Sequence, residues 1–303
     1  MTLDVRRLRV LREVARQGTI AAAARALHLT PPAVSQQLAA LEREADVRLL
    51  EREGRKVALT EAAHTLVAHT ETILAQLEAA AADIAAMEGR YGGSLRIGAF
   101  PTAAASFVAV ALAELAPRLP MVRVHVEELE PERALDLLKS GNLDLAVAHE
   151  YDLVPRRADP ALHRVELHTE PLRVALPPGH PLADAAGVDL AALADERWIA
   201  PPDGLTCLEE LHRLCGSAGF EPVLGSHAYT HPLVFALVAA GLGVALVPEL
   251  AVRQNLAGAA VRPLQHPAGC RRVFAATRRG TAHRPSIAAT LDALRAAADA
   301  EAR

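Results

Sequence analysis

Residues 18–42 read GTIAAAARALHLTPPAVSQQLAALE, and this stretch decides how the N-terminal part of the chain folds. Thr19 is placed to cap a short helix, because its hydroxyl can accept a hydrogen bond from a free N–H group of the first turn. Thr30 is placed to cap a second helix, in which Pro31 and Pro32 occupy the first turn, where a missing N–H costs nothing. The pattern therefore predicts two helices joined by a tight turn.

The second of these helices has one apolar face and one polar face. The apolar positions recur at helical spacing and are Val34, Leu38, Leu41 and Ala45. The residues that project from the opposite face are Pro32, Gln36, Ala39 and Arg43. Such a helix packs on its predecessor and presents its N-terminal polar residues to the DNA major groove, which is the arrangement of a helix-turn-helix.

Elements on both sides of this motif complete a small DNA-binding module. A first helix is predicted over residues 3–16, and two short strands are predicted at 48–50 and 57–59. The charged segment 51–56 between the strands forms a wing, in which Gly54 can supply the positive φ of a tight turn.

Charge is distributed unevenly along the 303 residues, although the net charge is only −4. Residues 1–60 contain 11 Arg and Lys against 7 Asp and Glu, whereas residues 61–303 contain 21 against 29. A basic N-terminal module followed by an acidic body is consistent with DNA binding at the N-terminus.

A long helix is predicted over residues 61–89, since this segment lacks internal glycine and proline. Its apolar positions follow a heptad over about four repeats. The a positions are Ala63, Thr70, Leu77 and Ile84, and the d positions are Leu66, Ile73, Ala80 and Met87. This pattern favours pairing with a second helix, and the alternative is packing against the chain's own domains.

Strands alternate with helices after a glycine-containing hinge at residues 91–94. The expected strands are 94–99, 122–126, 143–148, 162–167, 173–176, 198–200 and 245–247. The expected helices are 103–117, 132–140, 208–215, 232–240 and 286–300. This order predicts a parallel α/β sheet with right-handed crossovers.

The sequence AAAARALHLTPPAVSQQLAALE at 21–42, followed by DVRLLEREGRKVALTEAA at 46–63, resembles the winged helix-turn-helix of LysR-type transcriptional regulators. The segment GLGVALVPE at 241–249 is similar to the effector domain of the same family. The resemblance implies an N-terminal winged helix-turn-helix (1–60), a linker helix that dimerises (61–89), and a two-lobed α/β effector domain like a periplasmic binding protein (93–303). The chain would cross between lobes near 160 and 268, so that lobe I comprises about 93–160 and 269–303, and lobe II about 161–268.

The family correspondence also implies which residues contact DNA. The groove and backbone contacts would be Thr30, Pro31, Pro32, Ser35, Gln36 and Gln37, of which Gln37 lies nearer the buried face. The wing residues Arg52, Arg55 and Lys56 would contact phosphate or the minor groove. Pro31 stands where many relatives have Gln, and Gln36 where many have Arg. The operator preference of relatives therefore does not transfer to this chain.

A ligand site is expected at the carboxyl ends of the strands, where open α/β sheets bind ligands. The candidate effector-binding residues are Phe100, Thr102, Ala103, His149, Pro201, Thr206 and His227. Thr102 and Thr206 lie at predicted helix starts, whose free N–H groups favour negative charge. The expected effector is therefore a small anionic organic molecule.

The three cysteines leave a second hypothesis open. Cys207 and Cys215 are eight residues apart on one predicted helix, and one branch of the family senses peroxide through two cysteines with similar separation. The opposing interpretation is two ordinary thiols, because no His precedes Cys207 and the helix would have to unwind before a disulfide formed.

Other classes of protein fit the sequence less well. An enzyme would require a catalytic motif such as GxSxG, a Walker A loop or HExxH, and none is present in the sequence. An exported solute-binding protein would match 93–303 but would not carry a helix-turn-helix. We therefore expect a cytoplasmic regulator without cofactor or metal. Its expected partners are double-stranded DNA, a small-molecule effector, its own copies as a homodimer or homotetramer, and RNA polymerase, with no membrane partner.

Overall fold

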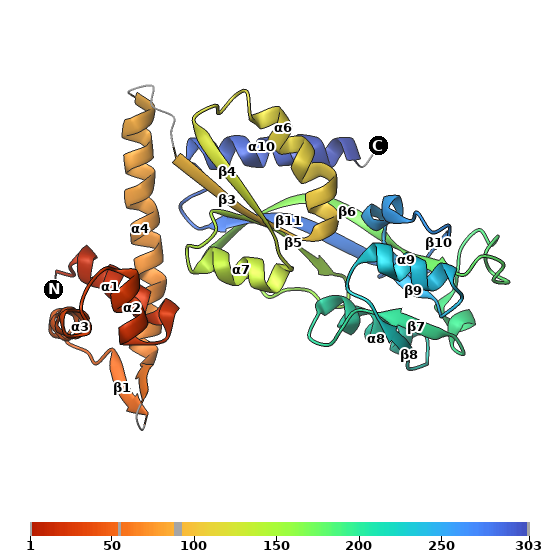
Figure 1. Cartoon of the computed structure of the whole chain (residues 1–303), viewed down its shortest axis with the longest axis horizontal. Coiled ribbons are helices and arrows are strands. Elements are labelled where there is room, and N and C mark those ends of the chain that lie inside the picture. Colours follow the sequence, from red (N-terminus) through yellow and green to blue (C-terminus); the bar gives the residue numbers. More distant parts are fainter. Residues whose placement is uncertain (1, 54–55, 88–92, 302–303) are drawn as a thin grey trace.

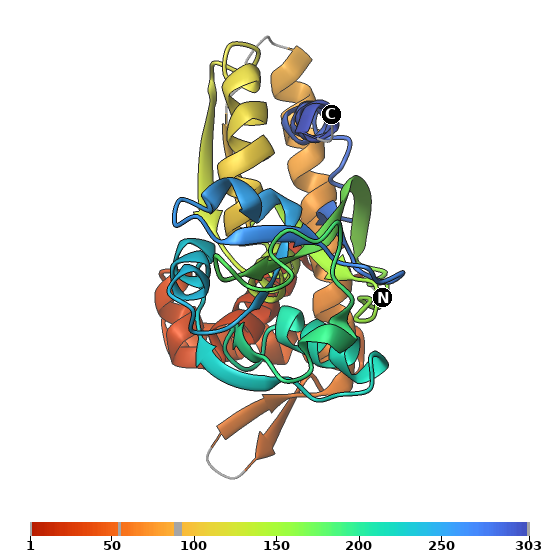
Figure 2. The same cartoon turned by 90° about the vertical axis from the view of Figure 1, so that its right-hand side faces the viewer.

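The computed structural model describes residues 2–53, 56–87 and 93–301, and it contains a small helical head, a long helix and a larger α/β region (Figure 1). The head lies at one end of the long helix, and the α/β region stands beside that helix (Figure 1). The view from the side shows the head's two-stranded wing projecting away from the α/β region (Figure 2). This arrangement confirms the expected fold class.

The head contains helices α1 (Val5–Gln17), α2 (Ile20–Ala26) and α3 (Pro31–Ala45). The two predicted caps are formed: the hydroxyl of Thr19 accepts from the Ala22 N–H at 3.2 Å, and that of Thr30 accepts from the Ala33 N–H at 3.4 Å. Three of the four predicted apolar positions of α3 are fully buried against α1 and α2, namely Val34, Leu38 and Leu41. The helix-turn-helix therefore follows from its local signals.

The wing is the antiparallel hairpin of β1 (Leu50–Glu53) and β2 (Lys56–Leu59). Glu42 of α3 fixes its first strand, because one carboxylate oxygen accepts from the backbone N–H groups of Leu49 at 2.8 Å and Leu50 at 3.2 Å. The prediction for Gly54 lies outside the described residues.

In helix α4 (Glu61–Met87) the a and d positions of the predicted heptad differ in burial between the first and the second half of the helix. At its start, Ala63 and Thr70 are fully buried, and Leu66 packs against the head's own core. Further along, Leu77 and Ile84 are exposed, with 61% of Ile84 accessible to solvent. The first half of the heptad therefore packs within the chain, whereas the second half presents an apolar stripe. Pairing of that stripe with a second helix stays a prediction.

The central sheet is mixed, not parallel as expected. In the described chain it contains seven strands in the order β10-β6-β11-β5-β3-β4, with β9 also paired to β6. Strands β3 (Gly93–Ala99), β4 (Val122–Glu128) and β5 (Leu145–Tyr151) are parallel, whereas β11 (Cys270–Arg278) runs antiparallel to β5 and β6. Strand β11 was not predicted from the sequence, and neither were β8 (Val223–His227) and β10 (Ala260–Pro263).

Helices cover both faces of the part of the sheet that forms lobe I (Figure 1). On one face lie α10 (Pro285–Glu301) and a continuous helical segment made of α5 (Pro101–Ala103), a π-helical turn (Ala104–Val108) and α6 (Ala109–Leu115). On the other face lies α7 (Pro131–Lys139), which packs on Ala146, Ala148 and Phe274.

Lobe II is built on the far half of β6 (Leu162–Leu176), which pairs there with β9 (Ala245–Pro248) and β10. A separate parallel pair, β7 (Arg197–Ala200) and β8, lies with α8 (Thr206–Ser217) and α9 (His231–Ala239). Two 3₁₀ turns, Leu190–Leu193 and Glu249–Gln254, complete this lobe.

A single strand carries the chain from one lobe to the other. The predicted strands 162–167 and 173–176 are one continuous strand, β6, whose first part pairs with β11 up to Pro171 and whose second part pairs with β9 from Leu172. The first crossing therefore falls at Pro171–Leu172, later than the expected position near 160. The chain crosses back to lobe I between β10 and β11, in the segment that contains the expected position 268.

Gly243 generates a prediction for the stability of lobe II. Its φ is +153°, and a Cβ atom built on it would lie 2.4 Å from the carbonyl oxygen of Arg197. That carbonyl accepts from the Val244 N–H at 2.8 Å and cannot move away without breaking the bond. We expect Gly243→Ala to lower the free energy of unfolding by about 2–3 kcal/mol in chemical denaturation.

The matched control is Gly216→Ala in helix α8, where an added Cβ meets no heavy atom within 4 Å. Because alanine favours the helix over glycine, this variant should be neutral or stabilising by up to about 1 kcal/mol. A Gly243→Ala variant as stable as Gly216→Ala would contradict the steric argument.

Candidate functional site

The exposed face of α3 carries the residues predicted to contact DNA. Thr30, Pro31, Pro32, Ser35, Gln36 and Gln37 are all exposed. Ser35 donates its hydroxyl to the Pro31 carbonyl at 3.1 Å, and the Gln37 side chain accepts from Arg7 of α1 at 3.3 Å. In the described residues Gln36 makes no side-chain hydrogen bond, so its amide is available to a base edge.

The predicted wing contacts are placed only in part. Arg52 belongs to β1 and Lys56 to β2, in adjoining rungs of the hairpin. The side chains of both residues, and the whole of Arg55, lie outside the described part of the chain.

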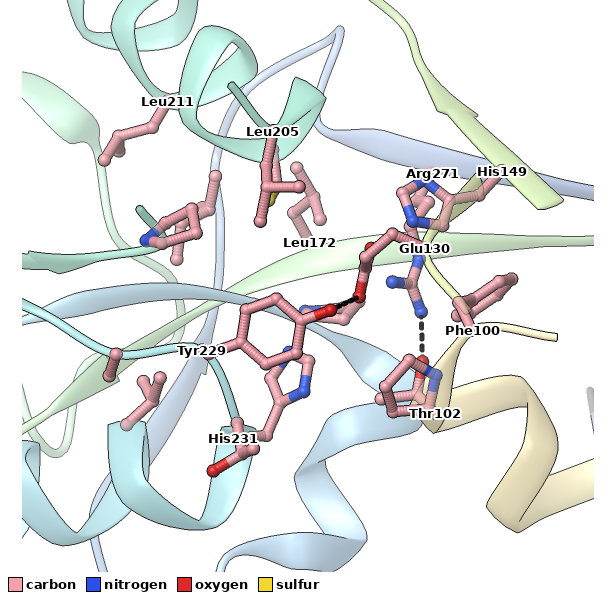
Figure 3. A pocket seen from close by; sticks show the side chains of 18 of the residues that line it. Phe100, Thr102, Glu130, His149, Leu172, Leu205, Leu211, Tyr229, His231 and Arg271 are labelled. Carbon is pink, nitrogen blue, oxygen red and sulfur yellow. Dashed lines mark hydrogen bonds between the residues drawn. The ribbon is translucent and has the colours of Figure 1, made fainter. Parts of the chain in front are cut away.

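A cavity of about 120 Å³ lies between the two lobes, at the carboxyl ends of β3 and β5 (Figure 3). Apolar side chains from both lobes form much of its wall. Its polar and titratable lining residues are Thr102, Glu130, His149, Tyr151, Cys207, Tyr229, Thr230, His231, Gln254 and Arg271. The volume is close to that of a cavity known to hold benzene, about 150 Å³, so the cavity as it stands admits only a small ligand.

A buried ion pair forms the floor of this cavity. The guanidinium of Arg271 contacts the Glu170 carboxylate through Nη2 at 2.6 Å and Nε at 2.8 Å, and the residues are 3% and 1% exposed. Arg271 Nη2 also donates to the Thr102 hydroxyl at 2.9 Å (Figure 3), and the second Glu170 oxygen accepts from the Leu250 N–H at 2.7 Å. The guanidinium carbon lies 4.8 Å from the ring centre of Phe100. The cation is therefore held in place before any ligand arrives.

Two histidines of the cavity are kept neutral. Burial lowers the pKa of His149 well below its usual value, and the nearby Arg271 lowers it further. Burial, with Arg271, also lowers the pKa of His231 to about 4. The ring of His149 packs edge-on between Phe100 and Tyr151, and its buried Nδ1 finds no hydrogen-bond partner among the described residues. These rings offer neutral hydrogen-bonding groups rather than positive charge.

Glu130 and Tyr229 meet across the cavity (Figure 3). The Tyr229 hydroxyl donates to Glu130 Oε1 at 3.1 Å. Burial raises the pKa of Glu130, and the hydrogen bond from Tyr229 opposes part of that rise. Burial also raises the pKa of Cys207 to about 12, and the Glu130 carboxylate adds to the effect.

The structure brings together four of the seven predicted effector-site residues: Phe100, Thr102, His149 and Pro201 line the cavity. Ala103 faces the core of lobe I instead, because it is fully buried between α6 and the sheet. His227 is exposed at the end of β8, where its Nδ1 contacts the Pro201 carbonyl at 3.2 Å.

The expectation for Thr206 was wrong about its position. Leu205 occupies the N-cap position of α8, without a side-chain cap, and Thr206 is the first helical residue. Since successive helical residues are turned by about 100°, Cys207 and Leu211 face the cavity while Thr206 faces a second hollow of about 490 Å³ on the other side.

Sequence reasoning missed Arg271, Glu170, Glu130, Tyr229 and His231. Arg271 and Glu170 are directly opposite each other on β11 and β6, and a signal for the strand existed in the short apolar run VFAA at 273–276. Glu130 and Tyr229 each lie in a loop before a helix. No local sequence pattern around either residue indicates that the two side chains are hydrogen-bonded to each other.

The cysteine geometry does not suit a disulfide. Cys207 and Cys215 lie on the continuous helix α8, where eight residues rise about 12 Å, whereas bridged Cα atoms are normally less than about 7 Å apart. Among the described residues no group of three His, Cys, Asp or Glu is arranged to hold a metal ion. No helix in the described chain is both long and apolar enough to span a bilayer.

Comparison with known proteins gives two family matches in chain order. Residues 5–64 match the bacterial regulatory helix-turn-helix protein, lysR family, and residues 88–299 match the LysR substrate binding domain. The HTH-type transcriptional regulator AlsR of Bacillus subtilis is 31% identical over 82% of each chain. A probable hydrogen peroxide-inducible genes activator of Mycobacterium avium is 32% identical over 81% of this chain and 78% of that protein.

A solved structure shares the whole architecture. A full-length OxyR variant from Pseudomonas aeruginosa superposes with a TM-score of 0.74 at 23% identity, covering 97% of this chain and 95% of that one, which establishes likeness of fold. The helix-turn-helix, the interlobe cavity and the two family matches occur in the same order along one polypeptide. The chain therefore belongs to the LysR family of DNA-binding transcriptional regulators, with a C-terminal effector-binding domain.

Proposed function

We propose that this regulator binds a two-fold-symmetric operator as an oligomer, and that a small carboxylate bound between its lobes changes the placement of the heads. It would act in the cytoplasm, where the chromosome is. The observation that carries the effector proposal is the Thr102 hydroxyl, which accepts a hydrogen bond from the buried Arg271 at the floor of the cavity.

The DNA-facing part of the proposal rests on Gln36. A glutamine amide can pair with both N6 and N7 of adenine, and each such pair contributes about 1–3 kcal/mol of base discrimination. The neighbouring Gln37 is already bonded to Arg7, and Ser35 to its own helix, so Gln36 is the principal candidate for direct readout.

The effector part rests on donors that a carboxylate can accept from. Because the Thr102 oxygen accepts from Arg271, its own proton is directed elsewhere and can be donated to a ligand. The unpartnered Nδ1 of His149 provides a second group at the same floor. Glu170 already offsets the charge of Arg271, so we expect affinity to depend on these hydrogen bonds more than on net charge.

The redox alternative is less well supported. A peroxide-reactive cysteine needs its thiolate, whereas burial raises the pKa of Cys207 to about 12 and keeps the thiol protonated. The spacing on α8 also places Cys215 out of reach without unwinding the helix.

Two exposed apolar surfaces support self-association. One is the stripe of α4 formed by Ile73, Leu77 and Ile84. The other lies at the sheet edge on β4, where Val124 and Val126 are exposed. Two separate surfaces on one chain allow a dimer of dimers, because each can join a different copy.

The first prediction concerns operator recognition. Gln36→Ala should reduce the discrimination between the operator and single-base variants by about 1–3 kcal/mol at one position, measured by fluorescence anisotropy. Arg55→Ala is the contrasting variant, because losing a phosphate contact should weaken binding to all sequences and reduce the salt slope by about 0.9. Unchanged affinity and selectivity in both variants would contradict the assignment of DNA contacts to Gln36 and Arg55.

The second prediction concerns the stripe of α4. Replacing Leu77 and Ile84 by Glu should weaken self-association at least about tenfold in sedimentation velocity, since each buried apolar side chain contributes roughly 1.5–3 kcal/mol. Thr65→Glu is the matched control, as Thr65 is exposed on the same helix but lies outside the a and d positions. A wild-type protein that sediments as a monomer at micromolar concentration would refute the proposal.

The third prediction concerns the effector. A panel of small carboxylic acids should contain at least one that raises the melting temperature of the wild type, because a ligand that binds only the folded state stabilises it. Thr102→Val should lose most of that increase relative to its own ligand-free value, whereas Thr102→Ser, which keeps the hydroxyl, should retain it. The result against the proposal is an equal increase in Thr102→Val, or a response to peroxide alone that Cys207→Ser abolishes.

A further inference from the structure

The contact between Glu130 and Tyr229 joins the two lobes at the rim of the cavity. Glu130 precedes α7 in lobe I, and Tyr229 lies between β8 and α9 in lobe II, 99 positions along the chain. Neither residue belongs to the two crossings between the lobes, which are β6 and the segment between β10 and β11. Their hydrogen bond of 3.1 Å therefore connects parts of the protein that the backbone does not hold together at this point (Figure 3).

Other contacts between the lobes differ from this one. The Leu153 N–H donates to Glu210 at 3.2 Å, and its carbonyl accepts from Arg213, which ties α8 to the segment after β5. None of these three residues lines the cavity, whereas Glu130 and Tyr229 both do. Opening the rim thus requires the Glu130–Tyr229 bond to break, whereas the α8 contacts lie away from the rim.

The position of Tyr229 suits a reversible closure. Tyr229 is 51% exposed, so water can replace Glu130 as the hydrogen-bond partner of its hydroxyl when the lobes separate. Glu130 is half-buried and faces the cavity. The cavity behind the pair is small, about 120 Å³, as expected for a closed cleft.

We propose that the Tyr229–Glu130 hydrogen bond is a latch that holds the effector cleft closed in the free protein, and that ligand entry requires this latch to open. The name effector cleft rests on the proposed function, but the closure is a property of the free protein. A hydrogen bond from a hydroxyl to a carboxylate is strong enough to favour the closed form and weak enough to open thermally.

Cys207 provides a built-in reporter of this closure. It lines the cavity together with Glu130 and Tyr229, whereas Cys270 does not line it and Cys215 is fully buried. The experiment is alkylation of the full-length, ligand-free protein with a bulky maleimide, followed by peptide mass spectrometry. The measured quantity is the alkylation rate of Cys207 divided by that of Cys270 in the same molecules.

Three variants separate the hydrogen bond from the charge. Tyr229→Phe keeps the ring and removes the donor, so the normalised rate should rise about threefold to tenfold. Glu130→Gln and Glu130→Ala both remove the charge that affects the Cys207 thiolate, but only Glu130→Gln keeps an acceptor for Tyr229. Glu130→Ala should therefore react about threefold to tenfold faster than Glu130→Gln, and adding Tyr229→Phe to Glu130→Ala should produce no further increase.

The control is Glu128→Gln, which removes a neighbouring exposed carboxylate without touching the latch and should react at the wild-type rate. The proposal is overturned if Tyr229→Phe reacts at the wild-type rate, if Glu130→Ala and Glu130→Gln react alike, or if the double variant shows the sum of both effects. No effector or DNA is present in this experiment. Its failure is thus distinct from a failure to find a carboxylate that stabilises the protein.

Discussion

The buried pair of Arg271 and Glu170 is the constraint on which the effector domain depends. A guanidinium removed from water is tolerated only when its charge and its donors are satisfied, and removing one partner of such a pair typically costs about 3–5 kcal/mol. Here the two residues face each other on β11 and β6, next to both crossings between the lobes, and their remaining contacts reach Thr102 in lobe I and the Leu250 N–H beyond β9. One ion pair thereby joins β6, β11, Thr102 and Leu250 at the floor of the cavity.

The same pair determines the chemistry that the cavity offers. Because Arg271 occupies the floor, protonation of His149 and His231 is disfavoured by both burial and repulsion, and the two rings stay neutral. The burial that lowers the pKa of these bases raises that of Cys207 and Glu130. The cavity therefore offers a ligand directed hydrogen bonds and little uncompensated charge. The basic head differs, because its attraction to DNA phosphate is long-ranged and depends on salt.

Predictions from the sequence succeeded where structure is local and failed where it depends on distant pairing. Thr19 and Thr30 cap their helices because the bonded partners lie three residues away. Strand β11 was missed because its place is set by β5 and β6, about a hundred residues earlier, and Arg271 was missed with it. The error at Thr206 was of one residue: in a helix that shift turns a side chain by about 100°, and Cys207 faces the cavity instead.

Strand β11 also provides the physical connection between cavity and head. It begins next to Arg271 at the cavity floor and ends at Arg278, whose guanidinium donates to the Leu138 carbonyl at 2.9 Å. Two residues later the Gly280 carbonyl accepts from Gln76 of α4 at 3.3 Å. Since β11 is hydrogen-bonded to β5 on one side and to β6 on the other, a continuous set of backbone and side-chain contacts runs from the cavity floor to α4. A ligand moves this equilibrium only by binding one arrangement of the lobes more tightly than the other, so an effector that fits both equally would leave the heads where they are.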